Sequence, residues 1–80
     1  MKIAIAGFGI EGESNYHYWA NDHNDQITIV DQKQPAKPLP AGVATIIGED
    51  AFEKLQDFDL VVRTAGLSPK KIRTNGNSIR

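Results

Sequence analysis

Residues 2–12, KIAIAGFGIEG, decide the fold because a short apolar run passes directly into three closely spaced glycines. The run from Lys2 to Ala6 contains β-branched residues and stops at a glycine, which is typical of a strand buried on both faces. From Ile10 to about Asn21 the apolar residues recur at helical spacing. The stretch therefore predicts a strand, a tight turn and a helix, with the strand at the centre of a parallel sheet.

The helix should lie on the sheet through one apolar face, formed by Gly12, Tyr16, Trp19 and Ala20 at i, i+4, i+7 and i+8. Because Tyr16 and Trp19 fall on this face, core packing explains the aromatic side chains better than base stacking. The polar residues 21–25 mark the end of the helix.

Further strands alternate with helical or loop connections along the rest of the chain. Such alternation predicts an α/β, Rossmann-like, doubly wound parallel sheet with strand order 3-2-1-4 and three layers in a single small domain. We expect the domain to span residues 1–69, and residues 70–80 to form a basic tail or linker. The expected elements are strands over 26–31 (QITIVD), 43–47 (VATII) and 58–63 (FDLVVR), a proline-containing loop after the second strand, and a short helix from Gly48 to about Leu55.

Composition excludes several classes of protein. The net charge of the 80 residues is −1, so no overall field attracts nucleic acid or an anionic membrane. The absence of cysteine excludes disulfides and thiolate metal sites, and His17 and His23 have no metal-ligand spacing. No apolar run approaches the ~18 residues of a membrane span. We therefore expect a cytoplasmic protein with no metal site and no catalytic residue in this chain.

The three glycines Gly7, Gly9 and Gly12 form a GxGxxG pattern after a strand and at the start of a helix. Gly7 permits the tight turn, Gly9 leaves the backbone open to a phosphate, and Gly12 lets the helix approach the strand. Asp31 ends the second strand about 20 residues further on, where an acid commonly binds a ribose hydroxyl. The pattern predicts a nucleotide site, although the glycines and the acid could instead serve the turn and the strand end alone.

Glu11 places a negative charge in the first turn of the helix. It either opposes a diphosphate there or points to solvent and stabilises the helix dipole. We favour the second reading, in which the ligand rests on backbone N–H groups.

Taken together, IAGFGIEG, ITIVDQK and FDLVVRTAGLSP resemble the N-terminal domain of the Mur ligases, above all of the D-glutamate-adding members. The resemblance covers nearly the whole chain. Its discriminating segment is the last one, in which Thr64-Ala65-Gly66-Leu67 stands where the family has Ser-Pro-Gly-Ile. The hydroxyl and the glycine are kept, whereas the proline is not.

The resemblance implies a domain that binds the UDP portion of UDP-N-acetylmuramoyl-L-alanine in peptidoglycan (cell-wall) biosynthesis. Beside the three glycines, it assigns the uridine end to Ile10, Glu11, Asp31, Gln32 and Lys33, and the diphosphate and sugar to Thr64, Ala65 and Gly66.

The family reaction uses ATP and Mg²⁺ to form an acyl phosphate that the amine of D-glutamate attacks. The 80 residues contain no GxxxxGK[ST] motif, which would hold the ATP phosphates. By the resemblance we expect an isolated first domain, without the central ATPase and C-terminal domains of the parent, and no ligation by this chain alone.

Two other functions stay open at this point. GxGxxG with Asp31 also fits an NAD(P)-binding Rossmann module of an oxidoreductase or a ligand-sensing regulator. Alternatively, the chain folds but retains no measurable affinity for a nucleotide.

Overall fold

The structure is a computed structural model that describes residues 1–20, 25–35, 38–64, 67, 72, 74 and 77–79; for residues 10, 11 and 77–79 only the backbone is described. It contains a five-stranded sheet in the order β3-β2-β1-β4-β5. Every neighbouring pair is parallel, so the predicted doubly wound α/β sheet with the core order 3-2-1-4 is confirmed. The elements are β1 (Lys2–Ala6), α1 (Ile10–Trp19), β2 (Gln26–Asp31), β3 (Ala44–Ile47), the 3-10 helix η1 (Ala51–Glu53), β4 (Leu60–Arg63) and β5 (Asn77–Ile79).

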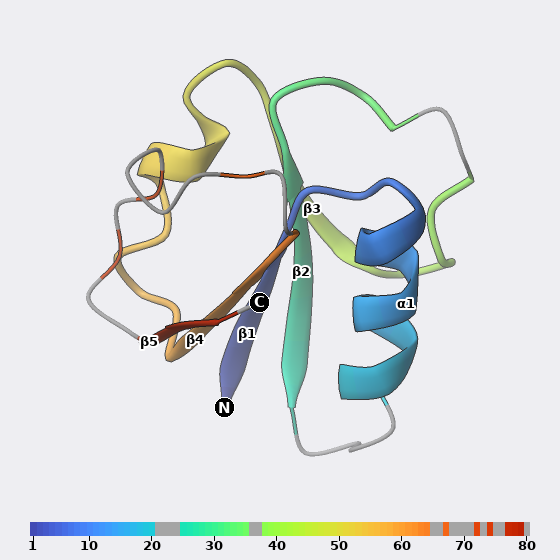
Figure 1. The fold of residues 1–80 in the computed structure, drawn as a ribbon, viewed down its shortest axis with the longest axis horizontal. Coiled ribbons are helices and arrows are strands. Elements are labelled where there is room, and N and C mark those ends of the chain that lie inside the picture. The colour runs from blue at the N-terminus through green and yellow to red at the C-terminus, as the bar shows by residue number, and fades with distance from the viewer. Residues whose placement is uncertain are drawn as a thin grey trace.

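Three layers are visible in Figure 1, with α1 on one face of the sheet and η1 on the other. The alternation of side chains along β1 divides the core between these faces. Ile3 and Ile5 point towards α1, where Tyr16 and Trp19 pack against their cluster. The other face holds Ala4, Ala6, Val30, Ala51, Phe52, Leu55, Phe58 and Val61.

β1 is the centre of the structure. Its residues Ile3 to Ala6 are fully buried, each with an exposed fraction of 0%. The strand pairs with β2 on one side and β4 on the other, which leaves no free edge. The prediction of a central strand buried on both faces is therefore confirmed.

The structure defines the ends of the two helical elements. α1 ends at Trp19 with Ala20 as its C-cap, whose N–H donates to the carbonyl of Tyr16 at 2.8 Å, and the predicted end at about Asn21 lies outside the described residues. The predicted short helix from Gly48 to Leu55 was wrong in length: only Ala51–Glu53 is helical, as a 3-10 turn. Gly48 has a φ of +150°, which no right-handed helix accepts.

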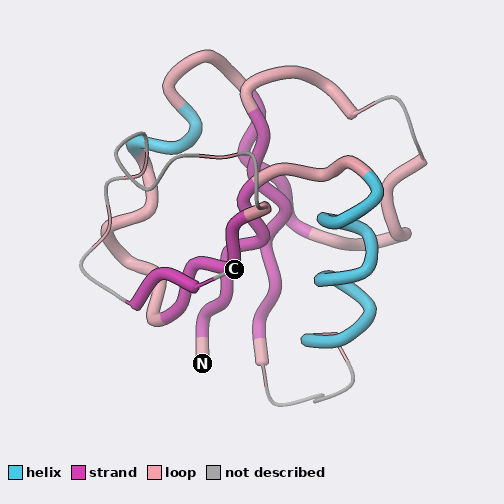
Figure 2. Tube along the Cα trace, in the orientation of Figure 1, coloured by secondary structure: helices cyan, strands magenta, loops and turns pink. Residues whose placement is uncertain are grey.

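The C-terminal segment contributes a strand that the sequence analysis did not expect. Within the predicted tail, β5 pairs with β4 in parallel, with Asn77 opposite Leu60 and Ile79 opposite Val62. Ile72, on the connection between the two strands, packs against the core cluster on the η1 face. The trace in Figure 2 shows β5 lying along β4. This segment therefore extends the sheet.

Candidate functional site

The glycine-rich turn lies between the carboxyl end of β1 and the start of α1, at the end of the sheet opposite the N-terminus (Figure 1). Both neighbouring strands hold it. The N–H of Gly7 donates to the carbonyl of Val30 in β2 at 2.8 Å, and the N–H of Thr64 after β4 donates to the carbonyl of Ala6 at 3.3 Å. The strand order reverses between β1 and β4, which is the switch point where ligands bind in open α/β sheets.

Packing and backbone conformation require two of the three glycines. Gly7 has a φ of +92°, a conformation that residues with a Cβ rarely adopt. A Cβ there would also lie 3.1 Å from the Cγ2 methyl of Thr64. At Gly12, which is buried in the first turn of α1, a Cβ would overlap the carbonyl of Gly7. Glycine at these two positions thus serves the fold itself.

Packing does not require glycine at Gly9, because a Cβ there would meet no atom within 4 Å. Its backbone angles, φ −93° and ψ −148°, lie outside the helical and strand regions. Gly9 is exposed and precedes α1, and no side chain caps the helix. The first helical hydrogen bond runs from the N–H of Glu13 to the carbonyl of Gly9 at 3.0 Å. The N–H groups of residues 10–12 therefore have no acceptor within the helix and lie beside an open backbone.

Asp31 lies next to the turn, as its position at the end of β2 predicts, but its carboxylate binds the protein's own backbone. Oδ2 accepts the N–H of Phe8 at 3.0 Å, and Oδ1 accepts the N–H of Gln32 at 2.8 Å. The carboxylate therefore joins the middle of the glycine turn to the end of β2.

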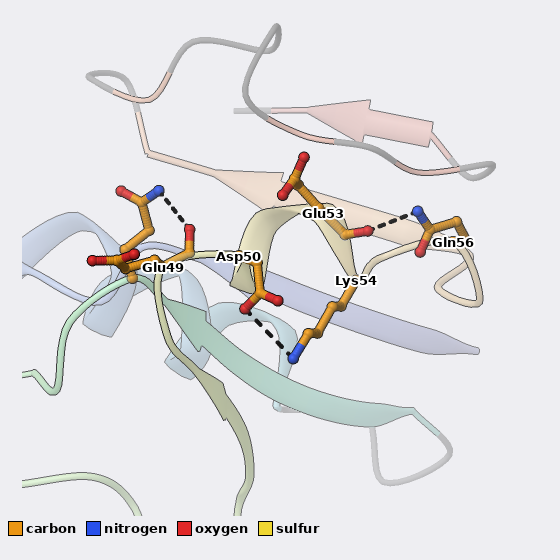
Figure 3. A network of polar contacts seen from close by, with 6 residues as sticks. Glu49, Asp50, Glu53, Lys54 and Gln56 are labelled. Atoms are coloured by element: carbon orange, nitrogen blue, oxygen red, sulfur yellow. Dashed lines mark hydrogen bonds and ion pairs between the residues drawn. The ribbon is translucent and has the colours of Figure 1, made fainter.

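Gln32 and Lys33, which follow Asp31, are both exposed. The side-chain amide of Gln32 donates to the carbonyl of Glu49 at 3.1 Å, which ties the loop after β2 to the loop after β3. Figure 3 shows the polar contacts around Glu49 and η1, including the ion pair between Asp50 and Lys54 at 3.5 Å. The carboxyl ends of β2 and β3 are thus linked beside the turn.

The structure brings Thr64 to the turn as predicted. Its side chain is partly buried and lies against Gly7. The other two residues assigned to this loop, Ala65 and Gly66, lie outside the described residues. The backbone of Ile10 and Glu11 forms the start of α1, and their side chains lie outside the description, so the role of Glu11 stays a prediction.

Arg63 is a candidate site residue that the sequence motifs did not indicate. It ends β4 directly opposite Ala6, one residue before the turn. Nη1 donates to the carbonyl of Leu67 at 3.1 Å, and within the described part of the chain the buried Nε–H has no hydrogen-bond partner. The sequence feature that could have indicated Arg63 is its position as the basic residue at the end of the apolar run LVVR. Its permanent charge adds a positive contribution at the carboxyl end of β4.

A pocket of about 250 Å³ lies elsewhere, at the other end of β2. It is lined by Tyr16, Ala20, Asp25, Ile27, Ala41, Gly42 and Val43. Asp25 and Ile27 stand at the start of β2, whereas the turn follows the end of β1, which runs parallel to β2. This pocket is therefore separate from the switch point.

Over the described ranges, no group of three or more His, Cys, Asp and Glu side chains could hold a metal ion. Neither helix in those ranges is long and apolar enough to cross a membrane.

Fold and turn together define the class of this protein: a small Rossmann-like α/β domain with a glycine-rich turn at its switch point. Comparison with protein-family models, with curated proteins and with solved structures finds no match for the chain.

Proposed function

We propose that the chain binds UDP-N-acetylmuramoyl-L-alanine, as the substrate-binding domain of a cytoplasmic D-glutamate-adding ligase of peptidoglycan biosynthesis. In this proposal the diphosphate rests on the backbone N–H groups at the start of α1. The uridine lies towards the loop after β2, and the sugar lies towards the loop after β4.

The observation that carries the proposal is the open backbone at Gly9. Gly7 and Gly12 are explained by conformation and packing, but a methyl group at Gly9 would meet nothing within 4 Å. A ligand that approaches the backbone closely explains why this position lacks a side chain.

The local electrostatics favour an anion at this position. The positive end of the α1 dipole and the first-turn N–H groups, which have no acceptor within the helix, lie beside Gly9. A helix N-terminus stabilises a nearby negative charge by roughly 0.3–1 kcal/mol. Arg63 adds a fixed positive charge on the neighbouring strand. Since the net charge of the chain is −1, affinity for a diphosphate has to come from this local arrangement.

The choice of a uridine ligand rests on the resemblance of the sequence to Mur ligases. ATP and Mg²⁺, which the resemblance implies for the ligation, do not fit the described residues. No group of three His, Cys, Asp or Glu side chains among these residues could hold a metal ion, and the sequence has no GxxxxGK[ST] motif. We therefore assign binding of the substrate to this chain and no step of the ligation.

Calorimetric titration of the chain with UDP-N-acetylmuramoyl-L-alanine, UDP and NADH tests the proposal. We expect saturable binding of both uridine ligands and a weaker or absent response to NADH. Saturable NADH binding without a response to either uridine ligand would instead support the dinucleotide-binding alternative and reject the proposal.

The substitution Gly9→Ala tests whether a ligand approaches the open backbone at Gly9. The variant should fold like the native chain because the added methyl group has room. It should bind UDP at least about tenfold more weakly, because a methyl group on the approached face displaces the phosphate and costs one or more hydrogen bonds.

Ser14→Ala is the matched control, since Ser14 is an exposed residue of the same helix. It should leave UDP affinity unchanged. Native affinity in a folded Gly9→Ala variant would show that the ligand does not rest on the turn.

A further inference from the structure

We infer that Asp31 is a positioning residue for the diphosphate, acting through the backbone of the glycine turn and not by touching the nucleoside. The inference rests on the proposed function and deepens it. It also revises the role that the sequence suggests for Asp31, namely an acid that binds a ribose hydroxyl.

Asp31 is held from three directions. Its carboxylate accepts the N–H of Phe8 at 3.0 Å, across 23 positions of sequence, and the N–H of Gln32 at 2.8 Å. Its main-chain carbonyl accepts the N–H of Gly48 at 3.1 Å. One residue therefore joins the turn, the loop after β2 and the end of β3.

The contact with Phe8 controls the direction of the turn. Phe8 stands between Gly7, where the backbone takes a positive φ, and Gly9, which directly precedes α1. Its side chain is only 4% exposed and packs in the core cluster under α1. With the ring fixed by the core and the N–H fixed by Asp31, the Gly7–Phe8 peptide is held in one orientation shortly before the first turn of α1. The donors that follow are therefore aimed before a ligand arrives.

The negative charge of Asp31 and its hydrogen bond to Phe8 have opposite effects on the affinity for an anion. A carboxylate beside a diphosphate repels it, so removing the charge alone would tighten the binding of an anion. Removing the hydrogen bond to Phe8 loosens the turn, which weakens the same binding. A weaker affinity for phosphate after substitution therefore reports positioning, and a stronger affinity reports repulsion.

The test uses NMR titrations of the native chain, Asp31→Ala and Asp31→Asn with inorganic pyrophosphate, uridine and UDP. Asp31→Ala should weaken pyrophosphate and UDP by the same factor, about tenfold or more for one lost hydrogen bond to a charged group, and leave uridine unchanged. Asp31→Asn should fall between, because Oδ1 of Asn can still accept the Phe8 N–H whereas its NH₂ group cannot accept the N–H of Gln32. Asp31→Asn also serves if the alanine variant does not fold.

Asp57→Ala is the control for charge, because it removes the same charge from an exposed residue. It should not weaken pyrophosphate. Loss of uridine affinity in Asp31→Ala with unchanged pyrophosphate affinity would make Asp31 a direct ligand and overturn the inference, as would tighter pyrophosphate binding.

A measurement without ligand separates this inference from the proposed function. In the native chain the Phe8 amide should exchange slowly with solvent, and in a folded Asp31→Ala chain it should exchange at least about tenfold faster. Equal exchange would overturn the inference even if UDP binds. A native chain that binds neither uridine nor any phosphate would reject the proposed function, whatever the Phe8 amide does.

Discussion

At the scale of the residue, opposing effects meet at Gly12. Glycine inside a helix is less favourable than alanine by up to about 1 kcal/mol. A Cβ at Gly12 would overlap the carbonyl of Gly7, however, and forcing atoms into a packed site costs typically about 1–3 kcal/mol. The steric cost exceeds the gain in helix propensity, so the close approach of α1 to the turn depends on glycine at this position.

After the gain in helix propensity is subtracted, Gly12→Ala should lower the free energy of unfolding by about 1–2 kcal/mol, with a melting temperature lower by roughly 4–16 °C for a domain of this size. Urea and thermal denaturation followed by circular dichroism measure the change. Gly9→Ala is the control and should lose less stability than Gly12→Ala, because its added methyl group meets nothing within 4 Å. Native stability of Gly12→Ala would contradict the close contact between α1 and the turn.

For individual residues of the candidate site, the sequence predicts their positions but not the directions of their side chains. The spacing of Gly7, Gly9, Gly12 and Asp31 predicted that they would meet, because parallel strands end at one edge of the sheet. It could not predict where the carboxylate of Asp31 points, because its hydrogen-bond donor, the N–H of Phe8, lies 23 positions away in the sequence. Arg63 was missed for a similar reason: its guanidinium donates to the carbonyl of Leu67, a contact that the apolar pattern of the strand does not reveal.

At the scale of the element, α1 has ten residues and is too short to be stable by itself in water. It is stabilised by the sheet, through Tyr16 and Trp19 against the cluster of Ile3 and Ile5. The periodicity of apolar residues predicted this contact because a 3.6-residue repeat places them on one face.

β5 could not be predicted in the same way. Its three residues, Asn77, Ser78 and Ile79, are too few and too polar for a period-2 pattern. The strand exists through its pairing with β4, a contact between distant parts of the chain. A local pattern carries no information on such a pairing.

Ile72→Ala tests whether the C-terminal segment belongs to the fold. Ile72 is partly buried against the core cluster on the η1 face, so the substitution should cost about 1–2 kcal/mol of unfolding free energy, less than a fully buried isoleucine. Lys54→Ala is the control: its ion pair with Asp50 is exposed and contributes under about 0.5 kcal/mol. Equal stabilities of the two variants and the native chain would show that residues 70–80 are a solvated tail after all.

At the scale of the whole molecule, the domain divides a small core between two faces of one sheet. A domain of 80 residues has an unfolding free energy of about 4–12 kcal/mol. The two faces are not equivalent: β1 presents isoleucines to α1 and alanines to η1. The small side chains leave room for Phe52 and Leu55 to approach the sheet, so the short η1 segment covers its face with few residues.

Leu55→Ala should consequently cause a large loss of unfolding free energy. Leu55 is completely buried, and truncating such a leucine costs about 2–5 kcal/mol, a large part of the total stability. We expect a chain that is partly unfolded at 37 °C, measured by thermal denaturation. A loss below 1 kcal/mol would mean that η1 does not cover the sheet as described.

Chemical-shift mapping of the ¹⁵N-labelled chain with UDP tests whether a nucleoside diphosphate binds at the glycine turn. We expect saturable shifts of the Phe8, Gly9, Ile10, Glu11 and Gly12 amides, with the amides of Tyr16, Ile27 and Val43 around the separate pocket unchanged. Shifts confined to that pocket, or no saturable shift at the turn, would show that the nucleotide does not bind there.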